Sequence, residues 1–177
     1  MKALKILTGI MVVLAIIIVV VSFFLPKTYF VNRSILISAP DSVIYRNIAD
    51  YNEFYKWNSW SKMDTAAAIK ITGEIAKPGH LYQWDGKKNG KGQMKITHVE
   101  PNKMIDMELK FIDPMESIAD TRFDIIPAEQ SNKVTWTMSG KSEGIVSKWM
   151  GLMMDKMVGK DFEDGLKSLK KKSEGRN

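Results

Sequence analysis

The sequence predicts an α+β protein, in which one membrane-spanning helix precedes a domain built from an antiparallel sheet and a long C-terminal helix. Three patterns lead to this fold class: an uncharged apolar stretch near the N-terminus, a series of segments with alternating apolar and polar residues, and an amphipathic helical pattern near the C-terminus. With 177 residues, the chain suits one domain plus a short extra segment rather than two full-sized domains.

Composition excludes several classes of protein. The chain has no cysteine, which excludes disulfide scaffolds, thiolate zinc sites and cysteine nucleophiles. Of the 26 basic residues, Lys2, Lys5 and Lys27 precede residue 29 with no acid among them, which leaves 23 basic against 20 acidic residues in the remainder. That mild excess does not predict a nucleic-acid partner.

The apolar stretch covers residues 6–25 and contains no charge. Twenty helical residues are about 30 Å long, which is the thickness of a hydrocarbon core. A cleaved signal peptide is the alternative, but its apolar region would be shorter and would end in small residues, whereas this one ends at Phe24-Leu25-Pro26. We therefore predict an uncleaved single-pass anchor with its linker over residues 1–28, and a domain over residues 29–177.

The orientation of the anchor depends on the basic residues at its two ends. Lys2 and Lys5 lie before it, and Lys27 and Arg33 follow. The positive-inside rule favours, by a small margin, a cytoplasmic N-terminus and an extracytoplasmic domain.

The domain is predicted to begin with a strand over residues 29–37, followed by a helix that starts near Pro40 and Asp41. A second short helical or irregular piece carries Trp57 and Trp60. Six segments then alternate with period two, which predicts an antiparallel sheet with one buried and one wet face. The segments centre on residues 69–72, 82–84, 94–97, 105–111, 119–125 and 134–138.

The last element is predicted to be a helix over about residues 146–172. Its first half places Val146, Met150, Met153 and Met157 on one stripe. Its second half uses a rotated stripe, and Gly159 lies where the two change over; the second stripe consists of Val158, Phe162, Leu166 and Leu169. A kink or a change of packing partner at this glycine is expected. The basic tail is either a solvated end or, beside anionic lipid, a membrane contact; it comprises Lys167, Lys170, Lys171, Lys172 and Arg176.

An ordered set of short motifs resembles the SRPBCC superfamily, the START/Bet v 1-like helix-grip proteins, and in particular its polyketide cyclase/dehydrase-like bacterial branch. The motifs are Ile35-x-Ile37-x-Ala39-Pro40, Trp57-Asn58-Ser59-Trp60-Ser61, Gly79-x-x-Tyr82-x-Trp84-x-Gly86, Gly90-x-Gly92-x-Met94, Val134 to Gly140, and Met150-Gly151 to Gly165-Leu166. The resemblance covers residues 29 to about 170. Members often have proline in or just after the tryptophan pair, where this chain has Ser59 and Ser61.

The resemblance implies a seven-stranded sheet curved around the C-terminal helix, with an apolar cavity between them. Many bacterial members of this branch also carry one N-terminal membrane helix. The predicted ligand-binding residues are the large apolar side chains on inner faces and the tryptophan pair. They are Trp57, Trp60, Tyr82, Trp84, Met94, Met107, Leu109, Phe123, Trp136, Met138, Met153 and Met157.

Catalytic and metal-binding patterns are sparse. The chain has two histidines; His80 lies in no nucleophile motif, and His98 shares strand parity with Met94, so it either faces the cavity or sits at the rim. The glycine-rich segment 86–92 lacks the phosphate-loop pattern and reads as a hairpin turn. We therefore predict no catalytic residue, no metal and no cofactor.

Three functions remain open at this stage. The first is a membrane-tethered module that binds a hydrophobic small molecule or lipid. The second is a cyclase/dehydrase-type enzyme, which would need inward acid or base groups where parity offers mainly Thr121, Tyr82 and His98. The third is a structural or stress-related interaction domain whose cavity is filled by its own side chains. The ligand and the oligomeric state are not determined by the sequence.

Overall fold

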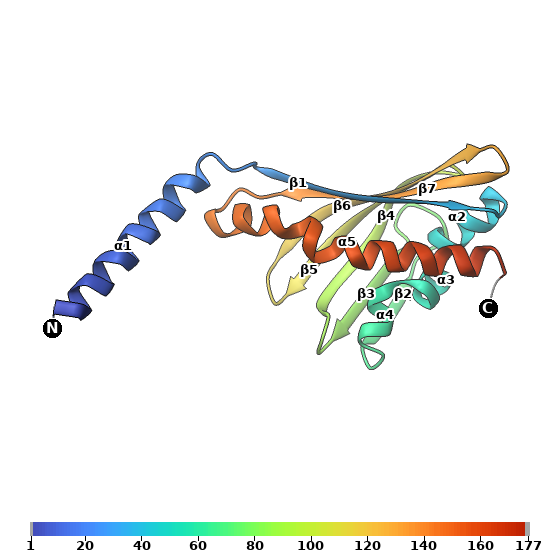
Figure 1. The fold of residues 1–177 in the computed structure, drawn as a ribbon. Coiled ribbons are helices and arrows are strands. Elements are labelled where there is room, and N and C mark those ends of the chain that lie inside the picture. The colour runs from blue at the N-terminus through green and yellow to red at the C-terminus, as the bar shows by residue number, and fades with distance from the viewer. Residues whose placement is uncertain (1, 176–177) are drawn as a thin grey trace.

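The computed structural model describes residues 2–175, and the predicted α+β fold is confirmed (Figure 1). The elements in chain order are α1 (Lys2–Ser22), β1 (Thr28–Ile37), α2 (Asp41–Ala49), α3 (Tyr51–Trp57), α4 (Ser59–Met63), β2 (Ala68–Thr72), β3 (Leu81–Gly86), β4 (Gly90–Glu100), β5 (Met104–Asp113), β6 (Ser117–Ala128), β7 (Ser131–Lys141) and α5 (Ile145–Ser173). Arg176 lies outside the described residues.

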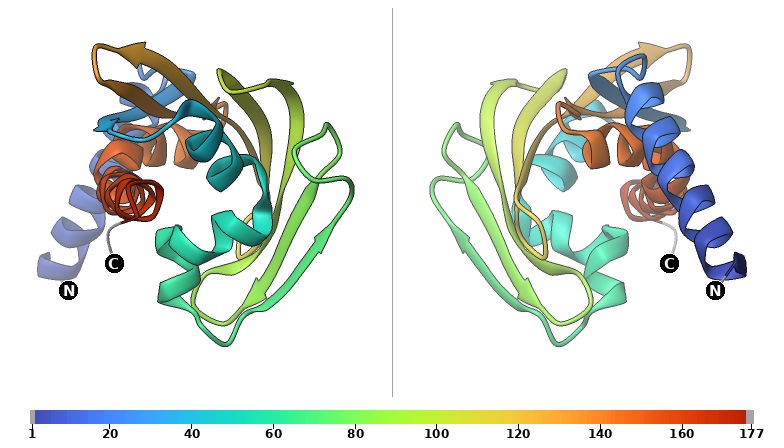
Figure 2. Two further views of the ribbon diagram at one scale, coloured as in Figure 1. Left: turned by 90° about the vertical axis from the view of Figure 1, so that its right-hand side faces the viewer. Right: turned by 90° about the vertical axis from the view of Figure 1, so that its left-hand side faces the viewer.

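Within residues 2–175, seven strands form one antiparallel sheet in the order β1-β7-β6-β5-β4-β3-β2. The strands from β2 to β7 form a meander, because each pairs with the next strand along the chain, whereas β1 crosses over to pair with β7. Figure 2 shows the sheet curving around the short helices α2–α4, with α5 along the β1 side. The concave face is therefore the buried face of the domain.

The turn after the first tryptophan folds as a helix although it lacks the proline common in this branch. The side chain of Asn58 caps α4 by accepting a hydrogen bond from the backbone N–H of Ser61 at 2.9 Å. The hydroxyl of Ser59 donates to the backbone carbonyl of Asp161 in α5 at 2.8 Å. Asn58 thus caps α4, and Ser59 fixes it against the C-terminal helix.

The long helix α5 changes its packing partner along its length. Its second half buries Phe162, Leu166 and Leu169 in the core, as the sequence predicts. Its first half packs on the edge strand β1, where Arg33 bridges Asp155 at 2.7 Å; Arg33 also bonds Glu163, just beyond Gly159, at 2.8 Å. A side chain at Gly159 would overlap the guanidinium group of Arg33, so this glycine allows the close approach. Figure 2 shows the two halves of α5 running in different directions.

The apolar helix α1 leaves the domain at the end where α5 begins (Figure 1). The ammonium group of Lys148 donates a 2.8 Å hydrogen bond to the backbone carbonyl of Ser22, the last residue of α1. Because the last carbonyls of a helix lack partners and carry the negative end of its dipole, Lys148 acts as a cap. Both residues are buried, so α1 and α5 are joined at this point.

Candidate functional site

The concave face is lined by the inward-facing residues of strands β3–β7, and the predicted strand parity holds for most of them. Met94 pairs with Leu109 across β4 and β5, and Phe123 pairs with Trp136 across β6 and β7. Seven of the predicted ligand-binding residues are buried on this face or against it, and three are half-buried. The buried ones are Trp57, Tyr82, Met94, Met107, Phe123, Trp136 and Met138, and the half-buried ones are Trp60, Trp84 and Leu109.

An aromatic cluster fills the concave face below the second half of α5. The indole of Trp136 is stacked between Phe162, with ring centroids 4.0 Å apart, and Phe123, at 4.7 Å. Trp57 and Trp60 meet its edge in T-shaped contacts at 5.9 and 5.6 Å. These rings are in direct contact, so this part of the interior is packed core.

Met153 and Met157, both predicted to bind the ligand, do not face the sheet. Their side chains are 55% and 52% exposed. The first half of α5 instead turns Gly159 and Asp155 toward β1. Periodicity correctly predicted that these residues share a stripe. However, Gly159 and Asp155, on another side of the helix, pack against the edge strand β1 in its place.

A half-buried apolar patch remains at the other part of the concave face, formed by Trp84, Leu109 and Phe111. The rings of Trp84 and Phe111 meet in a T-shaped contact at 6.1 Å. Trp84 lies across Gly92, where a Cβ would overlap the indole, and its Nε1 donates to the carbonyl of Asn89 at 3.2 Å. Phe111 was not among the predicted ligand-binding residues, although it shares strand parity with Leu109.

Two polar groups on the concave face, Thr121 and Tyr82, are the candidate acid or base groups. Thr121 accepts a hydrogen bond from Trp136 Nε1 at 2.9 Å and donates to the carbonyl of Thr137 at 2.8 Å. Burial, with a smaller effect from Tyr55, raises the pKa of the Tyr82 hydroxyl, which keeps it protonated at neutral pH. Neither group is placed as a base.

The two histidines have different surroundings. His80 is buried; its Nε2 accepts from the backbone N–H of Tyr51 at 3.2 Å, so Nδ1 carries the proton and donates to the carbonyl of Thr72 at 3.0 Å. His98 does not face the interior, because a β-bulge between Ile96 and His98 reverses the parity and pairs His98 with Asp106. His98 is therefore exposed, away from the aromatic cluster.

One buried polar atom has no hydrogen-bond partner near this face. The Tyr51 ring is fully buried, stacks on His80 with centroids 4.6 Å apart, and leaves its hydroxyl unpaired among the described residues. Burial raises the pKa of this hydroxyl. An unpaired buried hydroxyl costs free energy, so Tyr51 is a point where a ligand atom or a water molecule would stabilise the fold.

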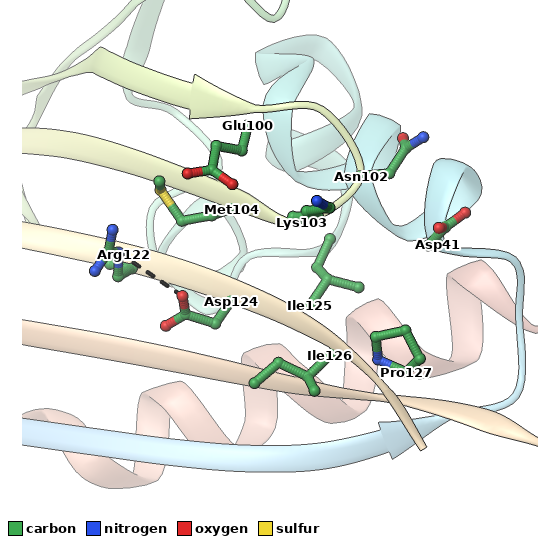
Figure 3. Close-up of a pocket in the computed structure, with 10 residues that line it drawn as sticks. All are labelled: Asp41, Glu100, Asn102, Lys103, Met104, Arg122, Asp124, Ile125, Ile126 and Pro127. Atoms are coloured by element: carbon green, nitrogen blue, oxygen red, sulfur yellow. Dashed lines mark ion pairs between the residues drawn. The ribbon is translucent and has the colours of Figure 1, made fainter. Parts of the chain in front are cut away.

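Two shallow pockets lie at the end of the domain opposite α1, and neither contains a predicted ligand-binding residue. Figure 3 shows the first, of about 410 Å³, between Asp41, Glu100 and Arg122. Its Asp124 is ion-paired with Arg122, and burial raises the pKa of Asp124 despite that pairing. No group of three or more acidic or histidine side chains in residues 2–175 is arranged to hold a metal ion.

The curved antiparallel sheet, with its long C-terminal helix and apolar concave face, defines a helix-grip protein of the SRPBCC class. More particularly, the chain belongs to the family described as polyketide cyclase / dehydrase and lipid transport, whose model matches residues 30–174. Among curated proteins, none matches the chain.

Solved structures share the fold at low sequence identity. A protein from Rhizobium leguminosarum superposes with a TM-score of 0.63 at 15% identity, covering 85% of this chain and 97% of that one. The di-domain ARO/CYC StfQ from the steffimycin biosynthetic pathway gives 0.63 at 8% identity, covering 84% of this chain and 51% of its own. The Aha1 dimer from Colwellia psychrerythraea gives 0.56 at 23% identity, covering 82% and 96%.

Proposed function

We propose that the protein is a membrane-tethered module that binds a hydrophobic small molecule or lipid on the concave face of its sheet. The observation that carries the proposal is the patch of Trp84, Leu109 and Phe111, which stays half-buried although it belongs to the inner face. A ligand that buried about 200 Å² of apolar surface there would gain roughly 5 kcal/mol before the costs of association.

The tether is supported by the length and composition of α1. Residues Ala3–Ser22 have a mean hydropathy of 3.0, and the most apolar part of this span packs against nothing in the domain. Phe23 and Phe24 continue the apolar surface beyond Ser22 and are 74% and 85% exposed. A bilayer would cover these side chains, with the domain on the extracytoplasmic side by the narrow charge bias at the two ends.

Family membership favours a hydrophobic ligand over a polar one, since the family description includes lipid transport. The same description includes cyclases and dehydrases, and StfQ is an ARO/CYC protein. For this chain the candidate acid and base side chains favour binding without catalysis. Thr121 is engaged in hydrogen bonds, and His98 lies on the outside of the sheet.

The aromatic cluster around Trp136 favours a second candidate, a structural or interaction domain whose interior is filled by its own side chains. The stacking of Trp136 between Phe162 and Phe123 is the observation behind it. The two candidates differ at the Trp84 patch, which would bind a ligand in the first and nothing in the second.

The test is native mass spectrometry of the full chain in lipid nanodiscs, followed by organic extraction of any molecule that copurifies. We expect a bound apolar molecule that is lost in Leu109→Asn and retained in Ile126→Asn, a control at an exposed apolar position on β6. Circular dichroism would establish that both variants are folded. If the folded wild type carries no molecule and takes none up from added fatty acid, the filled-domain candidate replaces the binding module.

A further inference from the structure

The first half of α5 exposes an unusually apolar surface for a helix in water. Its large exposed side chains fall, at 100° per residue, within an arc of roughly 140° on the side opposite Met154 and Val158, which pack against the core. Two basic side chains, Lys156 and Lys160, share that arc. The apolar members are Ile145, Val146, Trp149, Leu152, Met153 and Met157, which are 36–68% exposed; we call them the α5 apolar arc.

The α5 apolar arc begins where α1 leaves the domain. The hydrogen bond from Lys148 to Ser22 joins the two helices, and the exposed rings of Phe23 and Phe24 follow directly after that junction. Figure 1 shows α1 extending away from the domain at this end, whereas the C-terminal end of α5 lies at the opposite end. The exposed apolar side chains of the junction and of the arc therefore belong to the same end of the molecule.

We propose that the α5 apolar arc lies in the surface of the same lipid bilayer that α1 spans, as an interfacial amphipathic helix. This inference rests on the proposed tether. Continuity with α1 identifies the occupant, because the buried junction at Lys148 places the start of the arc at the point where the chain leaves the membrane. Trp149 and Lys156 are residue types that suit the headgroup region, where an aromatic ring or a long lysine stem bridges apolar and wet layers.

Docking of the arc would fix the orientation of the domain on the membrane. With α1 alone, the domain would be held by the linker between Ser22 and Thr28 and by the single Lys148–Ser22 junction. A second attachment through the first half of α5 would hold the β1 edge near the lipid. Within the basic tail, Lys170 and Lys172 are bonded to Leu36 and Glu53 at the far end of the domain.

The absence of cysteine makes a labelling experiment direct. Single cysteines would replace Leu152, Met153, Leu14 in α1, and Ile126, and each would carry a polarity-sensitive nitrobenzoxadiazole label. Ile126 is 56% exposed, like Met153 at 55%, but lies at the opposite end of the domain, so it is the matched control. The full chain would be placed, one copy per nanodisc, in phosphatidylcholine and phosphatidylglycerol, with or without a lipid that carries a nitroxide near its headgroup.

We expect the labels at residues 152 and 153 to emit at shorter wavelength than the label at residue 126 and to be quenched by the nitroxide lipid, while label 126 is not. Quenching at residue 14 without quenching at 152 and 153 would overturn the docking and leave the tether intact. Loss of quenching at residue 14 as well would overturn the tether and, with it, the docking. Because each nanodisc holds one copy, a second chain cannot produce the shielding, and a folded far-ultraviolet spectrum is required of each variant.

Discussion

The hydrogen bond between Trp136 and Thr121 offers a direct test of whether the centre of the domain is a packed core or a ligand cavity. Trp136 is 2% exposed and its Nε1 donates to the Thr121 hydroxyl at 2.9 Å. Thr121→Val keeps the side-chain shape but leaves the indole N–H buried without a partner. A buried unpaired donor costs about 1–3 kcal/mol, so the free energy of unfolding should fall by that amount.

The companion variant Trp136→Phe removes the donor as well as part of the ring. Alone it should cost roughly 2–3 kcal/mol, since complete truncation of a buried tryptophan costs about 3–5 kcal/mol. The double variant should be more stable than the sum of the two single effects predicts, by about 1–2 kcal/mol, because valine leaves no unpaired group once the N–H is gone.

Urea unfolding of the nanodisc-embedded chain, followed by circular dichroism, would measure these differences, with Thr121→Ser as the control that keeps the hydroxyl. If the slope of unfolding free energy against urea concentration is unchanged, the variants expose the same surface on unfolding as the wild type and their free energies can be compared directly. A Thr121→Val variant within about 0.5 kcal/mol of wild type would refute the reasoning. It would mean that water reaches the indole N–H, and therefore that the cluster borders a cavity.

Three further predictions concern other parts of the fold. Tyr51→Phe should raise the free energy of unfolding by about 1 kcal/mol, because its hydroxyl is buried without a partner; a loss of stability in urea melts would instead reveal a bound water or ligand at that oxygen. Hydrogen bonds from Lys172 and Lys56 lower the pKa of Glu53 to about 2, below its ordinary 4.5, so the stabilisation from this group is present above pH 4.5 and is lost as the pH falls toward 2. Thermal melts at pH 7, 4 and 2.5 should therefore show a smaller difference between wild type and Glu53→Gln as the pH decreases. The domain of residues 29–177 should unfold cooperatively without α1, because no residue of α1 belongs to its core. Removing α1 also takes away the partner of Lys148, but water can then reach the ammonium group. A gradual, non-cooperative urea transition would place the domain boundary elsewhere.

Much of the fold follows from local patterns of apolar and polar residues in the sequence, and tertiary contacts leave these elements as predicted. The apolar run of α1 is helical from Lys2 to Ser22, close to the predicted residues 6–25. Met107 and Leu109 lie on the inner side of β5, and Trp136 lies on the inner side of β7, because side chains alternate strictly along a regular strand. The site residues on the inner faces of the strands could therefore be predicted from this alternation alone.

Local patterns failed where a non-local contact or an irregularity decides the outcome. Parity does not predict the bulge that turns His98 outward. The sequence placed Trp60 among the ligand-binding residues, but it did not show that this ring would meet the edge of Trp136 or that Tyr51 would bury an unpaired hydroxyl.

The sequence by itself determined the apolar N-terminal helix, the seven strands and most of their inner-face residues, and the presence of two apolar stripes on the last helix. Only the tertiary structure decided which face of the first half of α5 is buried. Arg33 and Gly159 meet across 126 residues, and together with the ion pair between Arg33 and Asp155 this contact turns the methionine stripe outward. Periodicity identifies which residues share a face, but the surface that this face meets depends on the partner that packs most closely against the helix.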